Sequence, residues 1–172
     1  ILGAPNAGWG PILTTLANER TLIGGSQSAV KFDDIVELAR RFGAADDPVI
    51  RQELARHFAY TETMRYLGYR VQTAASKGAQ PGPESSVLKL AASRKLEHLG
   101  DLVEAIQGAA GMLWHESAEQ NGFWQNQFLG QWASRIGGGT DQIQRNIIGE
   151  NVLGLPSEPR VDKGIPFRDI PK

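Results

Sequence analysis

One carboxylate interrupts an apolar helical face near the start of the chain. Glu19 lies three residues after Leu16 and four before Ile23, so helical spacing places its side chain on that face. Burying a carboxylate is costly unless it is paired or protonated, and burial raises its pKa. Arg20 is adjacent in sequence but about 100° round the helix, so it is not automatically the partner. The pattern fits a general base in a water-poor site, or equally a carboxylate that reaches solvent or pairs with another helix.

A glycine-rich turn ahead of a helix is the second candidate for chemistry. Three glycines at residues 137–139 precede Thr140, and the next fourteen residues have helical spacing up to the stop signals Gly154 and Pro156. Thr140 is a good N-cap, and glycines let a ligand approach the backbone closely. The free N–H groups of such a terminus suit phosphate or another anion. The alternative is a turn that only joins two helices.

The segment GGTDQIQRNIIGENVLGLP, residues 138–156, resembles the closing motif of the acyl-CoA dehydrogenase family. In that family a helix-opening Gly-Thr followed by Ile-Gln-Arg lies beside FAD and carries, or faces, the catalytic base. The resemblance implies that Gly139, Thr140 and Gln142 face the flavin of a bound FAD.

The segment LANER, residues 16–20, resembles the first helix of the family's C-terminal domain, whose arginine lies close to the active site. Most members place the catalytic glutamate immediately before the Gly-Thr, and here that position is Gly138, which has no acid–base group. A minority, resembling the isovaleryl- and long-chain-specific enzymes, place the glutamate directly before the arginine of the first helix. The resemblance therefore implies that Glu19 is the catalytic base and that Arg20 contributes to substrate binding.

A second glycine turn resembles the family's Phe-Gly-Gly-Asn-Gly turn, which approaches the flavin pyrophosphate. Gly108 and Gly111 match that pattern, whereas Gln107, Ala109 and Ala110 replace the phenylalanine, the second glycine and the asparagine. The resemblance implies cofactor contacts at the two retained glycines.

A third set of contacts in the family comes from Arg-x-x-Phe-Gly and a glutamine seven residues later, both of which reach the FAD of a neighbouring subunit. Here Phe42 and Gly43 are retained, Arg40 and Arg41 are near the expected place, and Gln52 follows nine residues after the glycine. We assign Gln52 to cofactor binding on this resemblance.

Apolar residues at helical spacing predict long helices along the chain. The first covers residues 8–42, where the glycines at 24–25 weaken it locally and favour close packing of a neighbouring helix. Asp47 as N-cap and Pro48 at the first helical position begin a second helix, which runs to about residue 77.

The turn at residues 78–83 leads to a third helix, at about residues 84–108. Its charged side chains are expected to be mostly solvated, namely Lys89, Arg94, Lys95 and Glu97. No strand alternation competes with these stripes, so the sequence predicts an all-α up-and-down four-helix bundle with short extra helices. We expect this bundle at residues 1–154 and an extended tail at residues 155–172.

Aromatic residues gather between the third helix and the glycine-rich turn, at Trp114, Phe123, Trp124, Phe128 and Trp132. Few basic residues lie among them, which favours core or subunit-interface packing over a base-stacking surface for nucleic acid. The three histidines, His57, His98 and His115, show no metal-ligand spacing.

Composition limits the class of protein. The 172 residues are 41% hydrophobic and carry a net charge of −1, which fits one globular domain without an electrostatic case for nucleic acid or an anionic membrane. No apolar run is long enough for a membrane span. The absence of cysteine fits a reducing compartment, so we expect a cytoplasmic protein. The chain begins with Ile1 and lacks a recognisable signal peptide, and family members are about twice as long, so we expect a C-terminal fragment.

The resemblance implies an FAD-dependent acyl-CoA dehydrogenase of fatty acid β-oxidation, which converts an acyl-CoA thioester to a 2,3-enoyl-CoA. Electron-transfer flavoprotein is the implied electron acceptor, and a homo- or hetero-tetramer the implied assembly. We expect the fragment alone to be inactive and not to bind FAD tightly. Three alternatives stay open, namely a weakly active or non-catalytic partner subunit, a purely oligomerising bundle, and an acyl-CoA oxidase.

Overall fold

The computed structural model describes residues 3–25, 30–78, 82–157, 159, 162 and 164–170. Within these ranges the fold is all-α, which confirms the predicted class. The α-helices are α1 (Trp9–Gly25), α2 (Phe32–Arg41), α3 (Pro48–Ser76), α4 (Glu84–Gln107), α5 (Phe123–Ile136) and α6 (Asp141–Asn151).

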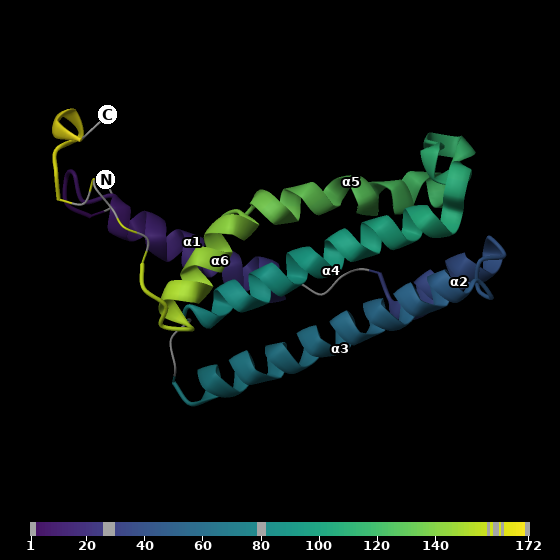
Figure 1. Cartoon of the computed structure of the whole chain (residues 1–172), viewed down its shortest axis with the longest axis horizontal. Helices are drawn as coiled ribbons and strands as arrows, with labels where there is room; N and C mark the ends of the chain where they lie inside the picture. Colours follow the sequence, from purple (N-terminus) through teal and green to yellow (C-terminus); the bar gives the residue numbers. More distant parts are fainter. Residues whose placement is uncertain are drawn as a thin grey trace.

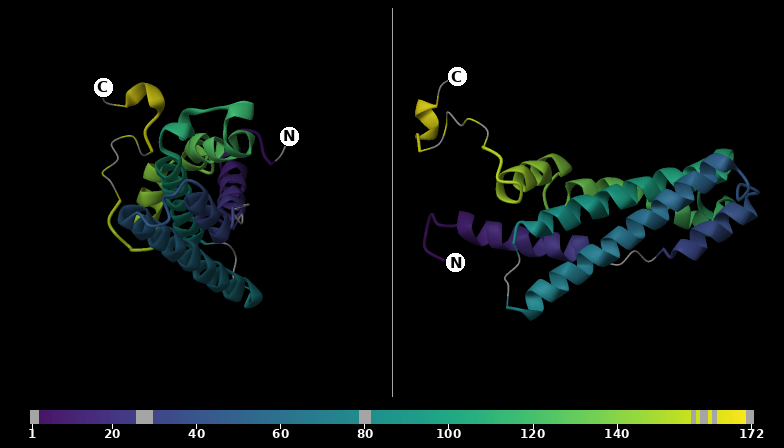
Figure 2. Two further views of the ribbon diagram at one scale, coloured as in Figure 1. Left: turned by 90° about the vertical axis from the view of Figure 1, so that its right-hand side faces the viewer. Right: turned by 60° about the horizontal axis from the view of Figure 1, so that its bottom comes forward.

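Helix α4 is the centre of the bundle and packs against α1, α2, α3, α5 and α6. Helices α3 and α5 run antiparallel to α4 on opposite sides of it (Figures 1 and 2). Helices α1 and α2 lie towards opposite ends of α4 and point the same way along the bundle (Figure 2). The bundle therefore has up-and-down topology. Helices α1 and α2 together form its first segment, and α3, α4 and α5 form the other three.

That division corrects the expectation of one helix over residues 8–42. Helix α1 ends at Gly25, and α2 begins only after Lys31, whose backbone is extended with φ −85° and ψ 154°. The Asp34 carboxylate accepts a 2.9 Å hydrogen bond from the Lys31 amide, which is a local signal for a new helix start. The paired glycines at the end of α1 thus mark a helix end rather than a packing point inside a helix.

The hydrophobic core lies at the end of the bundle that α2 and the start of α3 share with the second half of α4. Its buried residues are Val30, Ile35, Leu38, Ala39, Ile50, Leu54, Leu99, Leu102, Val103, Ile106 and Trp124. Along α1, by contrast, the apolar side chains of Trp9, Ile12 and Leu13 are exposed. Of the apolar residues on the predicted face of the first helix, only Val30, just before α2, and Ile35 and Leu38 in α2 lie in this core. Ile23 lies outside the residues whose side chains are described.

Helix boundaries follow their local signals closely. Asp47 caps α3 as predicted, since its carboxylate accepts hydrogen bonds from Val49 N at 2.7 Å and from Ile50 N at 3.1 Å. Helix α4 ends at Gly108, whose φ of +56° favours glycine. Helix α6 stops at Asn151, three residues short of the predicted end, and the described part of the following segment includes the short 3-10 helix η4 (Phe167–Asp169).

The aromatic residues divide between the core and the surface. Trp124 is only 1% exposed and packs in the core, whereas Trp114 and Trp132 are 41% and 52% exposed. In the part of the chain that the structure describes, no helix has both the length and the apolar character of a membrane span.

Candidate functional site

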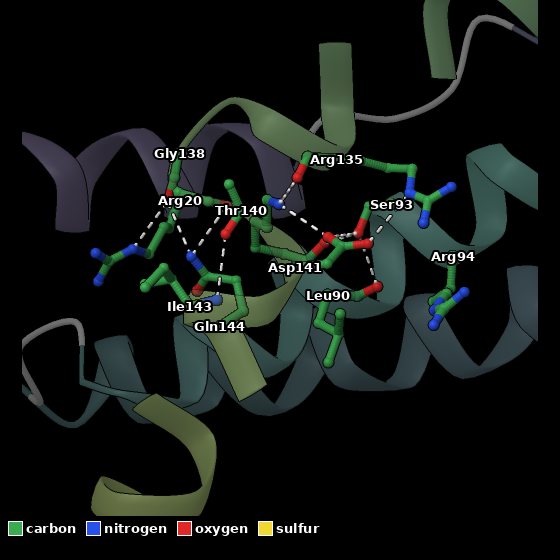
Figure 3. A network of polar contacts seen from close by, with 12 residues as sticks. Arg20, Leu90, Ser93, Arg94, Arg135, Gly138, Thr140, Asp141, Ile143 and Gln144 are labelled. Carbon is green, nitrogen blue, oxygen red and sulfur yellow. Dashed lines mark hydrogen bonds and ion pairs between the residues drawn. The ribbon is translucent and has the colours of Figure 1, made fainter. Parts of the chain in front are cut away.

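Helix α1 brings Glu19 and Arg20 against the turn between α5 and α6, which we call the closing turn (residues 137–140). The Gly138 amide donates a 2.9 Å hydrogen bond to Glu19 Oε1. Arg20 Nε donates a 3.1 Å hydrogen bond to the Gly138 carbonyl oxygen (Figure 3). Two neighbouring side chains thus hold both polar groups of one peptide position that lies more than a hundred residues away in sequence.

The Glu19 carboxylate is half-buried. Its Oε1 is oriented by the closing turn, and among the described residues no hydrogen bond reaches its Oε2. A carboxylate whose orientation is fixed through one oxygen is able to accept a proton from a bound molecule. Arg20 is likewise half-buried and serves the turn rather than pairing with Glu19.

The closing turn needs its glycines. Gly138 has φ +67° and Gly139 has φ +96°, values that side chains rarely adopt. A Cβ on Gly139 would lie 2.7 Å from Gln144 Nε2, so the buried Gln144 amide fills that space. Gln144 Nε2 donates to the carbonyl oxygens of Gly138 at 3.0 Å and Gly139 at 3.3 Å.

The start of α6 matches the predicted helix N-terminus. Thr140 is the N-cap, because its Oγ1 accepts a 3.3 Å hydrogen bond from the Ile143 amide. The first amides of α6, at Asp141 and Gln142, have no acceptor within the helix. The Gln142 side chain is exposed beside them. These donors form a candidate site for an anion or another hydrogen-bond acceptor, as the sequence predicted.

Asp141 belongs to a buried polar network that the sequence interpretation missed. Its Oδ1 accepts hydrogen bonds from Lys89 Nζ at 3.1 Å and Ser93 Oγ at 2.7 Å, and Arg135 Nε lies 3.6 Å from its Oδ2 (Figure 3). Burial alone raises the pKa of Asp141, but the hydrogen bonds from Ser93 and Lys89 and the charges of Lys89 and Arg135 hold it below its usual value.

Lys89 was expected to be a solvated charge, and that expectation is wrong, since the side chain is fully buried. Helical spacing contained a usable signal, because Ser86, Lys89 and Ser93 fall at i, i+3 and i+7 on one side of α4 and all three are buried. A polar stripe of this kind indicates a partner element with polar groups of its own.

The remaining predicted cofactor residues lie at the other end of the bundle. Gln52 is exposed near the start of α3, and Gly108 ends α4 with open space where a Cβ would stand. A Cβ on the buried Gly111 would collide with the Glu104 carboxylate, whose pKa burial raises. Gly108 follows Lys89 by nineteen residues, which is about 28 Å along α4. The structure therefore does not bring these residues to Glu19 within one chain.

Two histidines form a second buried polar cluster between α3 and α4. His57 Nδ1 lies 3.4 Å from His98 Nδ1, and His98 Nε2 lies 2.8 Å from Glu53 Oε2. Burial, then the charge of Lys95 and that of His98, lowers the pKa of His57 to about 4. Among the described residues, no group of three or more histidine, cysteine or acidic side chains has the arrangement of a metal site.

The up-and-down arrangement of the helices is that of a solved acyl-CoA dehydrogenase. The chain belongs to this family, since the family model described as acyl-CoA dehydrogenase, C-terminal domain, matches residues 6–153. No strand interrupts the helices in the described ranges, in agreement with that class.

Among individual relatives, the chain is similar to acyl-CoA dehydrogenase IpdE1 of Mycobacterium tuberculosis, with 36% identity over 93% of this chain and 41% of that protein. It is 39% identical to IpdE1 of Mycolicibacterium smegmatis, over 92% of this chain and 39% of that protein. The chain thus spans about two-fifths of the length of these relatives.

Solved structures give the same result. The Tcur3481-Tcur3483 steroid acyl-CoA dehydrogenase matches with a TM-score of 0.77 and 27% identity, over 91% of this chain and 42% of that chain. The ChsE4-ChsE5 complex from Mycobacterium tuberculosis matches with a TM-score of 0.66 and 25% identity, over the same shares, 91% and 42%. Both are described as assemblies of two different proteins.

Proposed function

We propose that this chain is the C-terminal domain of an FAD-dependent acyl-CoA dehydrogenase that converts an acyl-CoA thioester to a 2,3-enoyl-CoA, with Glu19 as the base. The observation that carries the proposal is the 2.9 Å hydrogen bond between Glu19 Oε1 and the Gly138 amide. In the family resemblance, Gly138 occupies the place where most members carry the catalytic glutamate. Glu19 therefore presents a carboxylate at that place from a different helix.

In this reaction the protein itself forms no covalent bond to the substrate, and it supplies a base and the positioning of the reacting groups. Glu19 accepts the proton from the carbon next to the thioester carbonyl, and the electron pair of that bond forms the new double bond. The hydrogen of the next carbon leaves with its electron pair, which bound FAD accepts as a hydride. Arg20 holds the Gly138 carbonyl and so keeps the base and the closing turn in one arrangement.

The residues at the start of α6 fit the flavin ring. The amides of α6 together with Thr140 and Gln142 supply hydrogen-bonding groups, and Gly139 allows the backbone conformation that places them. Gln52, Gly108 and Gly111 lie too far away to share that flavin. We assign them to FAD bound in a neighbouring subunit, which makes the cofactor site a property of an assembly.

The similarity to a protein described as a steroid acyl-CoA dehydrogenase directs the choice of substrate. We infer an acyl-CoA with a steroid acyl group as the first substrate class to test, ahead of straight-chain fatty acyl-CoA. We also infer a heteromeric assembly, because both solved relatives pair two different proteins. Electron-transfer flavoprotein is the acceptor that this proposal names.

The test uses the full-length protein with its partner and its flavin bound. Mixing it anaerobically with a panel of acyl-CoA thioesters, steroid and straight-chain, should bleach the flavin. Glu19→Gln should slow the bleaching at least about a hundredfold, the scale expected of a general base, whereas the exposed control Glu116→Gln should leave it unchanged. Bleaching that survives Glu19→Gln would remove Glu19 as the base, and rapid peroxide formation in air would indicate an oxidase.

A second candidate is a non-catalytic subunit of a two-protein dehydrogenase. The pairing of two proteins in both solved relatives favours it, because only one of two subunits need supply a base. In that case the complex would bleach with substrate and Glu19→Gln would turn over normally. A chain that retains no flavin even with its partner would instead indicate a purely oligomerising bundle.

We further propose that the 172-residue chain alone neither retains FAD nor turns over substrate. Gly108 lies about 28 Å along α4 from Lys89, the residue that contacts the helices on both sides of the closing turn, so one bundle presents only parts of two sites. Absorbance of the purified chain in the flavin region tests this directly. A yellow preparation with one flavin per chain would contradict it.

A further inference from the structure

The closing turn cannot hold its own shape. Three consecutive glycines precede Thr140, and glycine loses more conformational freedom on folding than any other residue. Gly138 nevertheless has to present its amide to Glu19 Oε1 at 2.9 Å. The position of that amide must therefore be fixed by contacts from outside the turn.

One buried ammonium group contacts the chain on both sides of this turn. Lys89 Nζ donates to the Arg135 carbonyl oxygen in the last turn of α5, at 3.4 Å, and to Asp141 Oδ1 in the first turn of α6, at 3.1 Å. Lys89 and Asp141 are 0% and 1% exposed. A short, strongly charged link between the helix that enters the turn and the helix that leaves it fixes the distance that the glycines must span.

The surrounding groups strengthen this link. Ser93 Oγ donates to Asp141 Oδ1 at 2.7 Å, and the Arg135 side chain lies between Asp141 and Glu97, with an Nη1–Oε1 distance of 2.9 Å to the latter. Figure 3 shows Asp141 joined by dashed lines to Ser93 of α4 and to Arg135 of α5. Arg94 Nη1 also lies 2.6 Å from Glu97 Oε2, so Lys89, Arg135 and Arg94 surround the two carboxylates of Asp141 and Glu97. Only the Lys89–Asp141 pair is fully buried, where the low dielectric strengthens the attraction.

We propose that Lys89 is a positioning residue for the base, which it affects only through the backbone of the closing turn. This inference rests on the proposed role of Glu19. Lys89 contacts neither Glu19 nor Arg20 among its described hydrogen bonds, and its contribution is to fix where Gly138 lies. Neutralising Lys89 should loosen the turn and misplace the Glu19 carboxylate.

The first experiment needs no turnover. Amide hydrogen exchange in the full-length flavoprotein is compared between wild type, Lys89→Met, and the matched control Lys95→Met, which replaces a half-buried lysine of the same helix. In Lys89→Met we expect exchange across residues 135–144 to rise by about tenfold or more beyond any rise in the core peptides of α2 and α3, which report the change in global stability. Unchanged exchange at the turn in a folded Lys89→Met protein would overturn the proposal.

The second experiment tests the connection to Glu19. Lys89→Met should lower the rate of flavin reduction at saturating acyl-CoA by about tenfold to a hundredfold and leave the Kd for acyl-CoA unchanged. In a Glu19→Gln background the same substitution should have no further effect, because the base it positions is absent. Equal losses in both backgrounds would overturn the proposal and indicate a general structural role.

The two experiments separate this inference from the proposed function. If the wild-type enzyme reduces no flavin with any acyl-CoA, the proposed function fails while the exchange measurement still decides whether Lys89 fixes the turn. If Lys89→Met does not fold, Ser93→Ala decides by the same readouts, since it removes only one hydrogen bond from Asp141. We then expect a smaller increase in exchange at the turn, and no increase would overturn the proposal.

Discussion

Helix α4 carries two buried polar clusters that solve the same problem differently. The turn cluster consists of Lys89, Ser93 and Asp141 and joins α4 to α6, whereas the histidine cluster consists of Glu53, His57 and His98 and joins α3 to α4. In the first, a buried cation meets a buried anion at 3.1 Å. In the second, the buried group is a histidine that can give up its charge.

The pKa values show what this difference means. Partner groups outweigh burial at Asp141 and lower its pKa, so the carboxylate stays ionised inside the protein. Burial is the main cause at His57, where it lowers the pKa to about 4, so the imidazole stays neutral. A buried ionisable group is therefore either paired or neutral. Only the charged pair, Lys89 with Asp141, links helices on the two sides of the closing turn by an electrostatic attraction.

The largest expected effect comes from breaking the paired cluster. Lys89→Met leaves Asp141 ionised and buried without its main partner, and we expect the free energy of unfolding to fall by about 3–5 kcal/mol. Chemical denaturation monitored by circular dichroism measures this change.

The double variant Lys89→Met/Asp141→Leu is the matched control for that loss. Replacing both members of a buried ion pair by apolar side chains is often close to neutral, so the double variant should be more stable than Lys89→Met alone. A double variant that loses the sum of the two single effects would show that the pair is not coupled.

Acid should weaken the histidine cluster next. Between pH 6.5 and about 4 the unfolded chain binds a proton at His57 that the folded chain excludes, so the free energy of unfolding falls as the pH falls. The shift amounts to a loss of up to about 3 kcal/mol. Denaturation midpoints measured across this range should decline in wild type, and His57→Gln should flatten the decline.

The two clusters should also lose their contributions to the free energy of unfolding in separate pH ranges. Asp141, with a pKa below its usual 3.8, loses its contribution only when the pH falls below that value, whereas the penalty at His57 is then already complete. His57 faces Lys95 and His98 on α4, and Glu53 on its own helix contacts His98. A decline that persists unchanged in His57→Gln would show that His57 is not its source.

The sequence predicted best what short segments determine. Asp47 with Pro48 begins α3, Thr140 caps α6, and Gly108 ends α4, because each signal acts within a few residues. The break between α1 and α2 was missed although Asp34 supplied a helix start, because the apolar spacing on either side seemed continuous. The helix-start signal at Asp34 therefore predicts the break better than the apolar spacing does.

In the candidate site, too, one contact was predicted from the sequence and another was not. The family resemblance predicted that Glu19 and the closing turn belong together, and the structure places them 2.9 Å apart. The burial of Lys89 was not predicted, since a lysine among charged residues on α4 is ordinarily solvated and its partner Asp141 comes fifty-two residues later. Only the packing of α6 on α4 makes that lysine an interior residue.

The smallest expected effect tests whether the histidine cluster also depends on charge. Glu53 is 29% exposed at its side chain and His98 is 13% exposed, so their 2.8 Å contact lies at the edge of the bundle. Water screens such a pair, and Glu53→Gln should lower the free energy of unfolding by less than about 1 kcal/mol at neutral pH. The glutamine keeps the shape and a hydrogen-bonding oxygen, so denaturation measures the loss of the carboxylate charge towards both His98 and Arg56, whose Nη1 lies 3.0 Å from Glu53 Oε2. A loss as large as that expected for Lys89→Met would mean that both clusters are ion-paired, and the distinction between them would then rest on His57 alone.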